Sequence, residues 1–396
     1  MSSTTAEVLR LRTADGAFVS GLLRVPDGGA DTVVSLMHPR EDVTHHPFAA
    51  HLLRAGAAVW TQNTRSVNND IRLLHEQALL DVAAGQKFLE ERGFGARVTL
   101  GHSGGATLFA FYQQQARLPG PDRITEAPDG TPVNLGGADM PVPDGAMFVA
   151  PHPGPGVLLQ RLIDPSVVDE CDPWSTDPSL DPYNPDNGFR SAPESSSYSP
   201  EFVERYRSAQ VDRVRRLDEV AASAALDTHR AGRAASSSRS VADRRASLAS
   251  NILVVHRTDA DLHSVDLSLD PNERPYGSLF GSRPDLGNFG FPGFCRITTA
   301  GAWMSTWSAT TSRANLVRNA GGVASATLLV ELTGDQGCFP ADARETYSAF
   351  AAHDKKHVRV AGTHFGGPIA PGGPTGADLA GQQMGRWLRE RFALTS

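Results

Sequence analysis

The chain has 396 residues, of which 40% are hydrophobic and 20% charged, so it can bury a sizeable core and is neither a fibrous nor a disordered sequence. Its formal net charge of −7 provides no basic field that would attract a nucleic acid. No apolar run approaches the roughly 18 to 20 residues that a membrane-spanning helix needs. We therefore expect no nucleic acid and no membrane among its partners.

The cysteines and the first residues bear on the cellular compartment. Cys171, Cys295 and Cys338 are an odd number and lack the spacing of a metal site, which favours free thiols in a reducing environment over a disulfide framework. Residues 1–7 show neither the charged start nor the apolar stretch of a signal peptide. We therefore expect a cytoplasmic protein.

Residues 1–150 predict strands that alternate with helices. Apolar and charged side chains alternate within residues 7–26 on both sides of a turn at residues 14–16, which indicates two antiparallel strands. Apolar runs predict further strands at residues 32–37, 57–61, 97–100 and 145–150. Helical spacing and glycine stops predict helices at residues 47–55, 73–92 and 106–115. This alternation is typical of a parallel sheet with helices on both faces.

The alternation stops after residue 150 and resumes near residue 321. Between them lie a loop-like stretch at residues 172–200, a helix at residues 200–225 that we expect to lie across the core domain, and a Ser/Arg-rich segment at residues 231–250 that fits a loop as well as a binding surface. The regular pattern returns with strands at residues 326–332 and 358–361 and helices at residues 341–352 and 376–392. We interpret residues 1–150 and 321–396 as a core domain and residues 151–320 as an inserted cap or lid.

A motif that can supply a nucleophile follows the predicted strand at residues 97–100. Gly101-His102-Ser103-Gly104-Gly105 stands between a predicted strand and a predicted helix. In that context Gly-x-Ser-x-Gly forms a turn so tight that its flanking positions need glycine, and the turn holds the serine hydroxyl above the sheet. Ser103 is therefore the candidate nucleophile.

A serine needs a histidine as its base and a carboxylate that orients the histidine. His364 follows the last predicted strand, and Asp335 follows the strand at residues 326–332, which gives the chain order serine, acid, histidine. Asp259 and Asp261 compete for the role of the acid, because they follow an apolar run at residues 252–256. For either of them to be the acid, the run at residues 252–256 would have to be the penultimate core strand. Two further predicted strands follow that run before His364, so we assign the acid to Asp335.

The loop after residue 37 is expected to complete an oxyanion hole, which is a set of N–H donors aimed at the oxygen that becomes negative. One donor is the backbone N–H of Gly104, and the second is the backbone N–H of Arg40, because Pro39 has no N–H. The Arg40 side chain can meet an acidic group of a ligand or form an ion pair with Glu41 or Asp42.

The remaining candidates concern a ligand pocket and a metal. The expected pocket residues are His38, Arg40, His102, Trp303 and Trp307. The last two belong to a cluster that fits the core of the cap as well as an apolar pocket wall, together with Phe289, Phe291 and Phe294. His75-Glu76 lacks the second histidine of a zinc-protease motif, and no phosphate-binding loop is found, so we expect neither a metal nor a cofactor.

These motifs together resemble the α/β-hydrolase family. The resemblance covers residues 7–150 and 325–394 and rests on His38-Pro39, residues 101–105, Gly334-Asp335 and Thr363-His364-Phe365. It implies an α/β fold with a mostly parallel eight-stranded sheet flanked by helices, an inserted cap or lid, and cofactor-free hydrolysis through an acyl-enzyme on Ser103. His38-Pro39-Arg40 departs from the His-Gly-Gly of many lipases and esterases.

The expected function is that of a serine hydrolase for a small apolar or aromatic carboxylic ester. An amidase, a lactonase or a carbon–carbon bond hydrolase uses the same triad, and these alternatives stay open. An alternative of another class is a non-catalytic ligand receptor on a hydrolase scaffold. The partner is expected to be a small-molecule substrate, and the oligomeric state is open, with a homodimer as one option.

Overall fold

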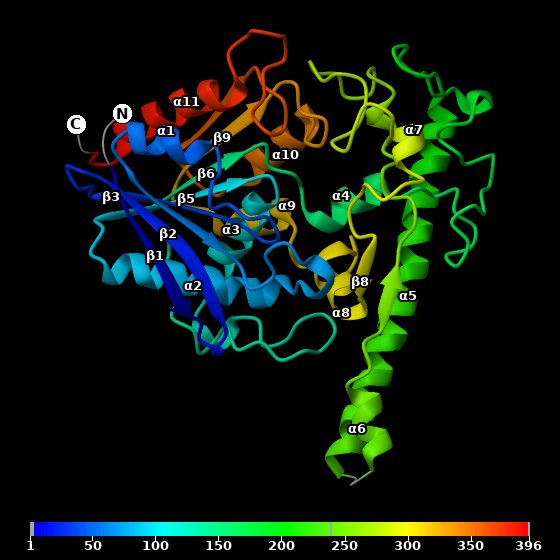
Figure 1. The fold of residues 1–396 in the computed structure, drawn as a ribbon, viewed down its shortest axis with the longest axis horizontal. Coiled ribbons are helices and arrows are strands. Elements are labelled where there is room, and N and C mark those ends of the chain that lie inside the picture. Colours follow the sequence, from blue (N-terminus) through cyan, green and yellow to red (C-terminus); the bar gives the residue numbers. More distant parts are fainter. Residues whose placement is uncertain (1–3, 238–239, 395–396) are drawn as a thin grey trace.

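An eight-stranded sheet forms the centre of the computed structural model, which describes residues 4–237 and 240–394 (Figure 1). The strands lie in the order β1-β2-β4-β3-β5-β6-β9-β10, and all neighbours from β4 to β10 are parallel. The mostly parallel eight-stranded sheet that the sequence predicts is thereby confirmed. The strands are β1 (Thr4–Arg12), β2 (Phe18–Pro26), β3 (Thr32–His38), β4 (Ala58–Asn63), β5 (Ala96–His102), β6 (Gly145–Val149), β9 (Ala326–Leu332) and β10 (Lys355–Val360).

Helices cover both faces of this sheet because the central strands are apolar on both faces. All seven residues of β3 and all five of β6 are buried. Helices α1 (Phe48–Arg54) and α11 (Gly376–Arg391) pack on one face, and α2 (His75–Glu91), α3 (Gly104–Ala116) and α10 (Pro340–Ala349) pack on the other. The predicted core helices are therefore confirmed to within a few residues at their ends. Within the described ranges no helix is both long and apolar enough to cross a membrane.

A large helical insertion separates β6 from β9 (Figure 1). Its longest element is α5 (Pro200–Ser237), which extends well beyond the core. Its other elements are α4 (Pro155–Leu162), α6 (Val241–Ser247), β7 (Ile252–Val254), α7 (Pro284–Gly287), β8 (Ile297–Thr299), α8 (Ala300–Ala302) and α9 (Leu316–Asn319). Short turns of helix lie at η1 (Asp70–Arg72), η2 (Gly120–Asp122), η3 (Pro185–Asn187), η4 (Leu262–Ser264), η5 (Trp303–Trp307) and η6 (Ala320–Gly322).

The insertion differs from the sequence prediction in three respects. Helix α5 continues to Ser237 instead of ending near residue 225, and α6 occupies part of the predicted Ser/Arg-rich loop, of which residues 238–239 lie outside the described chain. Helix α5 does not lie across the core domain, since its buried residues join apolar clusters formed by the insertion itself. The predicted strand at residues 252–256 is β7, which pairs with β8 in a separate two-stranded sheet.

Candidate active site

Ser103 occupies a sharp turn between β5 and α3. Its backbone has φ 52° and ψ −120°, a conformation that residues other than glycine rarely adopt and that is common at functional sites. The glycines around it allow the close approach of the chain. A Cβ at Gly105 would lie 2.3 Å from the Met37 carbonyl oxygen, and a Cβ at Gly101 would lie 2.5 Å from the backbone of Ala106. The motif thus folds into the strained strand-to-helix turn of a nucleophile elbow.

His364 connects Ser103 to Asp335 by hydrogen bonds. The His364 Nε2 lies 3.0 Å from the Ser103 hydroxyl oxygen, and its Nδ1 lies 2.8 Å and 3.0 Å from the two carboxylate oxygens of Asp335. Both His364 and Asp335 are buried, and the loops after β10 and β9 carry them to the same edge of the sheet. The Asp335 carboxylate also accepts the backbone N–H groups of Gly337 at 2.7 Å and Cys338 at 3.0 Å, which fix its orientation.

The environment of His364 favours its role as a base. Burial of the ring opposes protonation, but the charge of Asp335 and the hydrogen bond to it outweigh burial, so the pKa of His364 is raised above its usual value. Because Asp335 holds the proton on Nδ1, the lone pair of Nε2 faces the Ser103 hydroxyl. The arrangement can accept a proton from Ser103 and stabilise the imidazolium that results.

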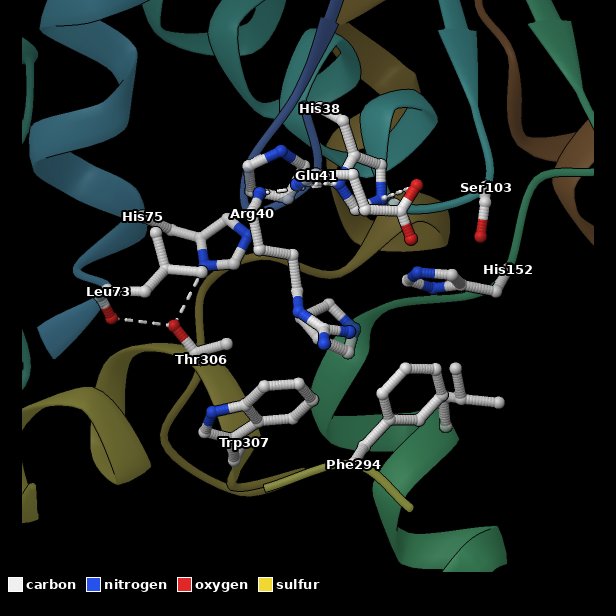
Figure 2. A pocket seen from close by; sticks show the side chains of 14 residues that line it. His38, Arg40, Glu41, Leu73, His75, Ser103, His152, Phe294, Thr306 and Trp307 are labelled. Carbon is white, nitrogen blue, oxygen red and sulfur yellow. Dashed lines mark hydrogen bonds and ion pairs between the residues drawn. The ribbon is translucent and has the colours of Figure 1, made fainter. Parts of the chain in front are cut away.

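A cavity opens onto Ser103 (Figure 2). Its polar side is formed by Ser103, Gly104, His38 and His152, and Figure 2 shows the two histidine rings on the side of the serine. Its apolar wall comes from both the core and the insertion and contains Leu73, Leu158, Phe294 and Trp307. A small ligand with an apolar body and one polar reacting group matches this lining.

Backbone N–H groups fix the orientation of the His38 and His152 rings. The Nδ1 of His38 accepts the N–H of Glu41 at 2.9 Å and that of Arg40 at 3.3 Å. The Nδ1 of His152 accepts the N–H of Gly154 at 3.1 Å. Burial, together with the charge of Arg40, holds the pKa of His38 well below its usual value, and burial above all lowers the pKa of His152 to about 3. Both rings are therefore neutral near pH 7.

Arg40 lies in the cavity but differs from its predicted arrangement. Its backbone N–H points to His38, so the structure gives it a partner other than a ligand oxygen. Its guanidinium forms an ion pair with Asp70 at 3.1 Å, where the sequence suggested Glu41 or Asp42, and it lies over the rings of Phe294 and Trp307. The side chain closes one side of the cavity between the core and the insertion.

Two of the predicted pocket residues, His102 and Trp303, do not line this cavity in the described part of the chain. His102 Nε2 donates a hydrogen bond to the His364 carbonyl oxygen at 2.8 Å, so the ring supports the loop that carries the base. Trp303 is buried in the core of the insertion, where its Nε1 donates to Asp218 at 2.7 Å. Of the aromatic cluster, Phe294 and Trp307 reach the cavity.

Comparisons with known proteins bear on the fold. No protein-family model and no curated protein matches the chain. The solved structure of DcsB in complex with its substrate analogue is similar at 13% sequence identity and a TM-score of 0.50, over 98% of this chain and 100% of that chain. Est1E from Butyrivibrio proteoclasticus is similar at 9% identity and a TM-score of 0.46, over 97% and 98% of the two chains. A hydrolase of the α/β fold family from Bacillus anthracis str. Sterne matches at 11% identity and a TM-score of 0.43, over 98% and 99%.

The strand order, the elbow after β5 and the positions of Asp335 and His364 decide the fold. The chain has the α/β-hydrolase fold. At sequence identities this low, similarity to solved structures supports the fold and does not assign a function.

The strand order also shows that neither Asp259 nor Asp261 is the acid that orients His364. β7 lies outside the eight-stranded sheet, so Asp259 and Asp261 do not follow a core strand. Asp261 pairs with Arg207 at 2.9 Å and His263 at 2.8 Å, and the Asp259 carboxylate accepts the Ser278 hydroxyl at 3.0 Å. Both carboxylates serve contacts inside the insertion.

Asp335, Cys338 and His364 are the group in the described chain whose spacing would suit a metal ion, with ligand atoms within 4.8 Å of one another. Burial, followed by the charges of Asp335 and Asp342, raises the pKa of the Cys338 thiol well above its usual value. The protonated thiol donates to the Ala150 carbonyl oxygen at 3.0 Å. Metal binding needs a thiolate, so these residues fit a hydrogen-bonded triad better than a metal centre.

The sequence interpretation did not place His152, Glu41 or His75 at the cavity. His152 follows β6, the strand next to β5, so its place at the carboxyl end of a neighbouring core strand was the signal available. Glu41 comes near the cavity because the chain turns back after Pro39, and its carboxylate lies 3.9 Å from His38 Nε2 (Figure 2). That turn leaves no recognisable pattern in the sequence.

Proposed function

We propose that the protein is a serine hydrolase that cleaves a small carboxylic ester through an acyl-enzyme on Ser103. The observation that supports this proposal is the continuous set of hydrogen bonds from the Ser103 hydroxyl through His364 to Asp335. The partly exposed serine lines the cavity, and the buried base is hydrogen-bonded to it.

The proposed reaction has two halves that use the same groups. Ser103 Oγ attacks the acyl carbon while its proton passes to His364 Nε2, and the carbonyl oxygen becomes an oxyanion. The intermediate collapses, the leaving alcohol takes the proton from His364, and the acyl group stays on Ser103. A water molecule then gives a proton to His364 and attacks the acyl carbon, and His364 returns this proton to Ser103 Oγ as the ester bond breaks and the acid leaves.

The cavity supports a substrate with a small apolar or aromatic acyl group. The apolar side chains of Leu158, Phe294 and Trp307 provide contact area, and all three belong to the insertion. We therefore further propose that residues 151–320 act as a cap on a core of residues 1–150 and 321–396. The three free thiols, Cys171, Cys295 and Cys338, support a cytoplasmic location.

A fluorophosphonate probe tests the nucleophile without assuming the substrate. We expect the intact mass of the wild type to increase by one adduct, and the adduct to be absent from Ser103→Ala. A panel of p-nitrophenyl esters, anilides and lactones then assigns the bond that is cleaved. Folded wild-type protein that binds acyl compounds but forms no adduct would contradict the proposal and support the ligand-receptor alternative.

A further inference from the structure

We infer that His38 and His152 complete the oxyanion hole with their Nε2–H groups, beside the backbone N–H of Gly104. This inference rests on the proposed function and assigns two further catalytic residues to it. It also replaces Arg40 as the predicted second donor, because the Arg40 N–H is directed at His38.

The tautomers of both rings follow from their partners. A neutral imidazole has one N–H and one lone pair, and a nitrogen that accepts a hydrogen bond is the one without hydrogen. Nδ1 accepts backbone N–H groups in both residues, from Arg40 and Glu41 in one ring and from Gly154 in the other. The proton of each ring is therefore on Nε2.

Both Nε2 atoms approach one point next to the nucleophile. A Cβ built on Gly104 would lie 2.7 Å from the Nε2 of His38 and 3.2 Å from the Nε2 of His152. The bare Cα of glycine leaves this space open. Because Gly104 follows Ser103 and begins α3, its N–H faces the region where the acyl oxygen becomes negative. Three N–H donors thus surround one small space.

These two N–H groups have no hydrogen-bond partner among residues 4–237 and 240–394. The Glu41 carboxylate is 3.9 Å from His38 Nε2, which is too long for a hydrogen bond, and its side chain is 46% exposed, so it can turn toward solvent. The histidines themselves are only 5% exposed. Buried donors that are oriented in advance and aimed at an open space are the arrangement that stabilises a developing negative charge.

Asparagine substitutions separate the donor role from the structural role. The side-chain oxygen of asparagine reaches about as far as Nδ1 and can still accept the loop N–H groups, but asparagine carries nothing at the position of Nε2. We expect His38→Asn and His152→Asn each to lower kcat/KM for a p-nitrophenyl ester by about 10²–10³-fold through kcat, with KM nearly unchanged. Glutamine, which places an N–H near Nε2, should restore part of the rate at either position.

A transition-state analogue gives the second measurement. The inhibition constant of a trifluoromethyl ketone, whose adduct on Ser103 carries an oxyanion, should rise in proportion to the loss of kcat/KM in the asparagine variants. His45→Asn is the matched control, because His45 is an exposed histidine of the same loop, and it should leave both values unchanged.

The outcomes distinguish this inference from the proposed function. Wild-type protein that does not form the fluorophosphonate adduct would overturn both. Wild-type protein that reacts on Ser103, while both asparagine variants keep kcat/KM within twofold or lose it through KM alone, would overturn only the assignment of the two histidines. If an asparagine variant does not fold, a crystal structure of the wild-type trifluoromethyl ketone adduct decides, because an oxyanion beyond hydrogen-bond distance of both Nε2 atoms contradicts the inference.

Discussion

Asp335 determines which nitrogen of His364 carries a proton, and the consequence can be tested by exchanging one carboxylate oxygen for an NH2 group. Asp335→Asn keeps the shape of the side chain but can donate to Nδ1, which places the proton on Nε2 and removes the lone pair that faces Ser103. We expect kcat to fall about 10⁴-fold with the fold intact. Ester hydrolysis and circular dichroism measure the two effects. Asp259→Asn is the control, and an active Asp335→Asn variant would assign the acid to another carboxylate.

The charge of Glu41 affects the base. His364 must be neutral to accept a proton, and its pKa is raised above the usual value by Asp335 first and by Glu41 as a smaller contribution, against the effect of burial. Activity is therefore expected to fall as the pH drops through this raised pKa. A negative neighbour favours the charged imidazolium, so removing it lowers the pKa.

Glu41→Gln should accordingly move the acidic limb of the kcat/KM profile to lower pH. It should also raise the maximal kcat/KM, because the carboxylate near His38 Nε2 opposes the developing oxyanion. Initial rates from pH 4 to 9 measure both effects, with the exposed Glu91→Gln as control. A limb that moves to higher pH in Glu41→Gln would contradict this account of the site.

At the scale of elements, the large apolar side chains that α5 buries lie in its first half, and those of its second half are exposed. Its buried residues all lie between Phe202 and Ala221, and Leu217 is 3% exposed whereas Leu226 is 56% exposed. Leu217→Ala should lower the free energy of unfolding by about 2–5 kcal/mol, and Leu226→Ala should change it by less than about 0.5 kcal/mol. Both changes have the same effect on helix propensity, so urea unfolding of the two variants isolates burial. Equal losses would contradict the exposure of the Leu226 side chain.

The same helix shows what the sequence could and could not predict. Core strands such as residues 326–332 are continuous apolar runs, and their hydrophobic pattern fixes both type and position. The distal half of α5 has no apolar face, so periodicity gave no reason to continue the helix past residue 225, although its alanines and arginines favour helix. Helix propensity alone is a weak predictor of a helix. In the distal half of α5 it nevertheless indicated the helix, whereas hydrophobic periodicity did not.

The site divides in the same way. The triad could be predicted from the sequence, because Ser103, Asp335 and His364 belong to motifs with a known order along the chain. The directions of the His38 and His152 rings depend on which backbone N–H groups meet their Nδ1 atoms after folding. Such contacts join residues two or three positions apart in irregular loops, where no periodicity exists to reveal them.

At the scale of the whole molecule, the core supplies the Ser103-His364-Asp335 triad and the insertion supplies most of the apolar wall of the cavity. Trp307 and Phe294 come from the insertion and line the cavity, while Arg40 of the core lies against both rings, 5.5 Å and 4.8 Å from their centres. The cavity that Ser103 lines is therefore closed where the two parts meet.

Trp307→Leu should enlarge this space and shift the preference toward longer acyl chains. Trp303→Leu is the matched control, because Trp303 is equally buried in the same apolar cluster but does not line the cavity. We expect the ratio of kcat/KM for p-nitrophenyl octanoate to that for the acetate to rise roughly tenfold or more in Trp307→Leu, and to stay unchanged in Trp303→Leu. Both variants lose stability by removal of a buried indole, and Trp303→Leu also loses the hydrogen bond to Asp218. Urea unfolding should therefore report at least as large a loss in Trp303→Leu, while only Trp307→Leu changes the selectivity. An equal shift in both variants would mean that loosening of the insertion, rather than the shape of the cavity wall, controls which substrates are accepted.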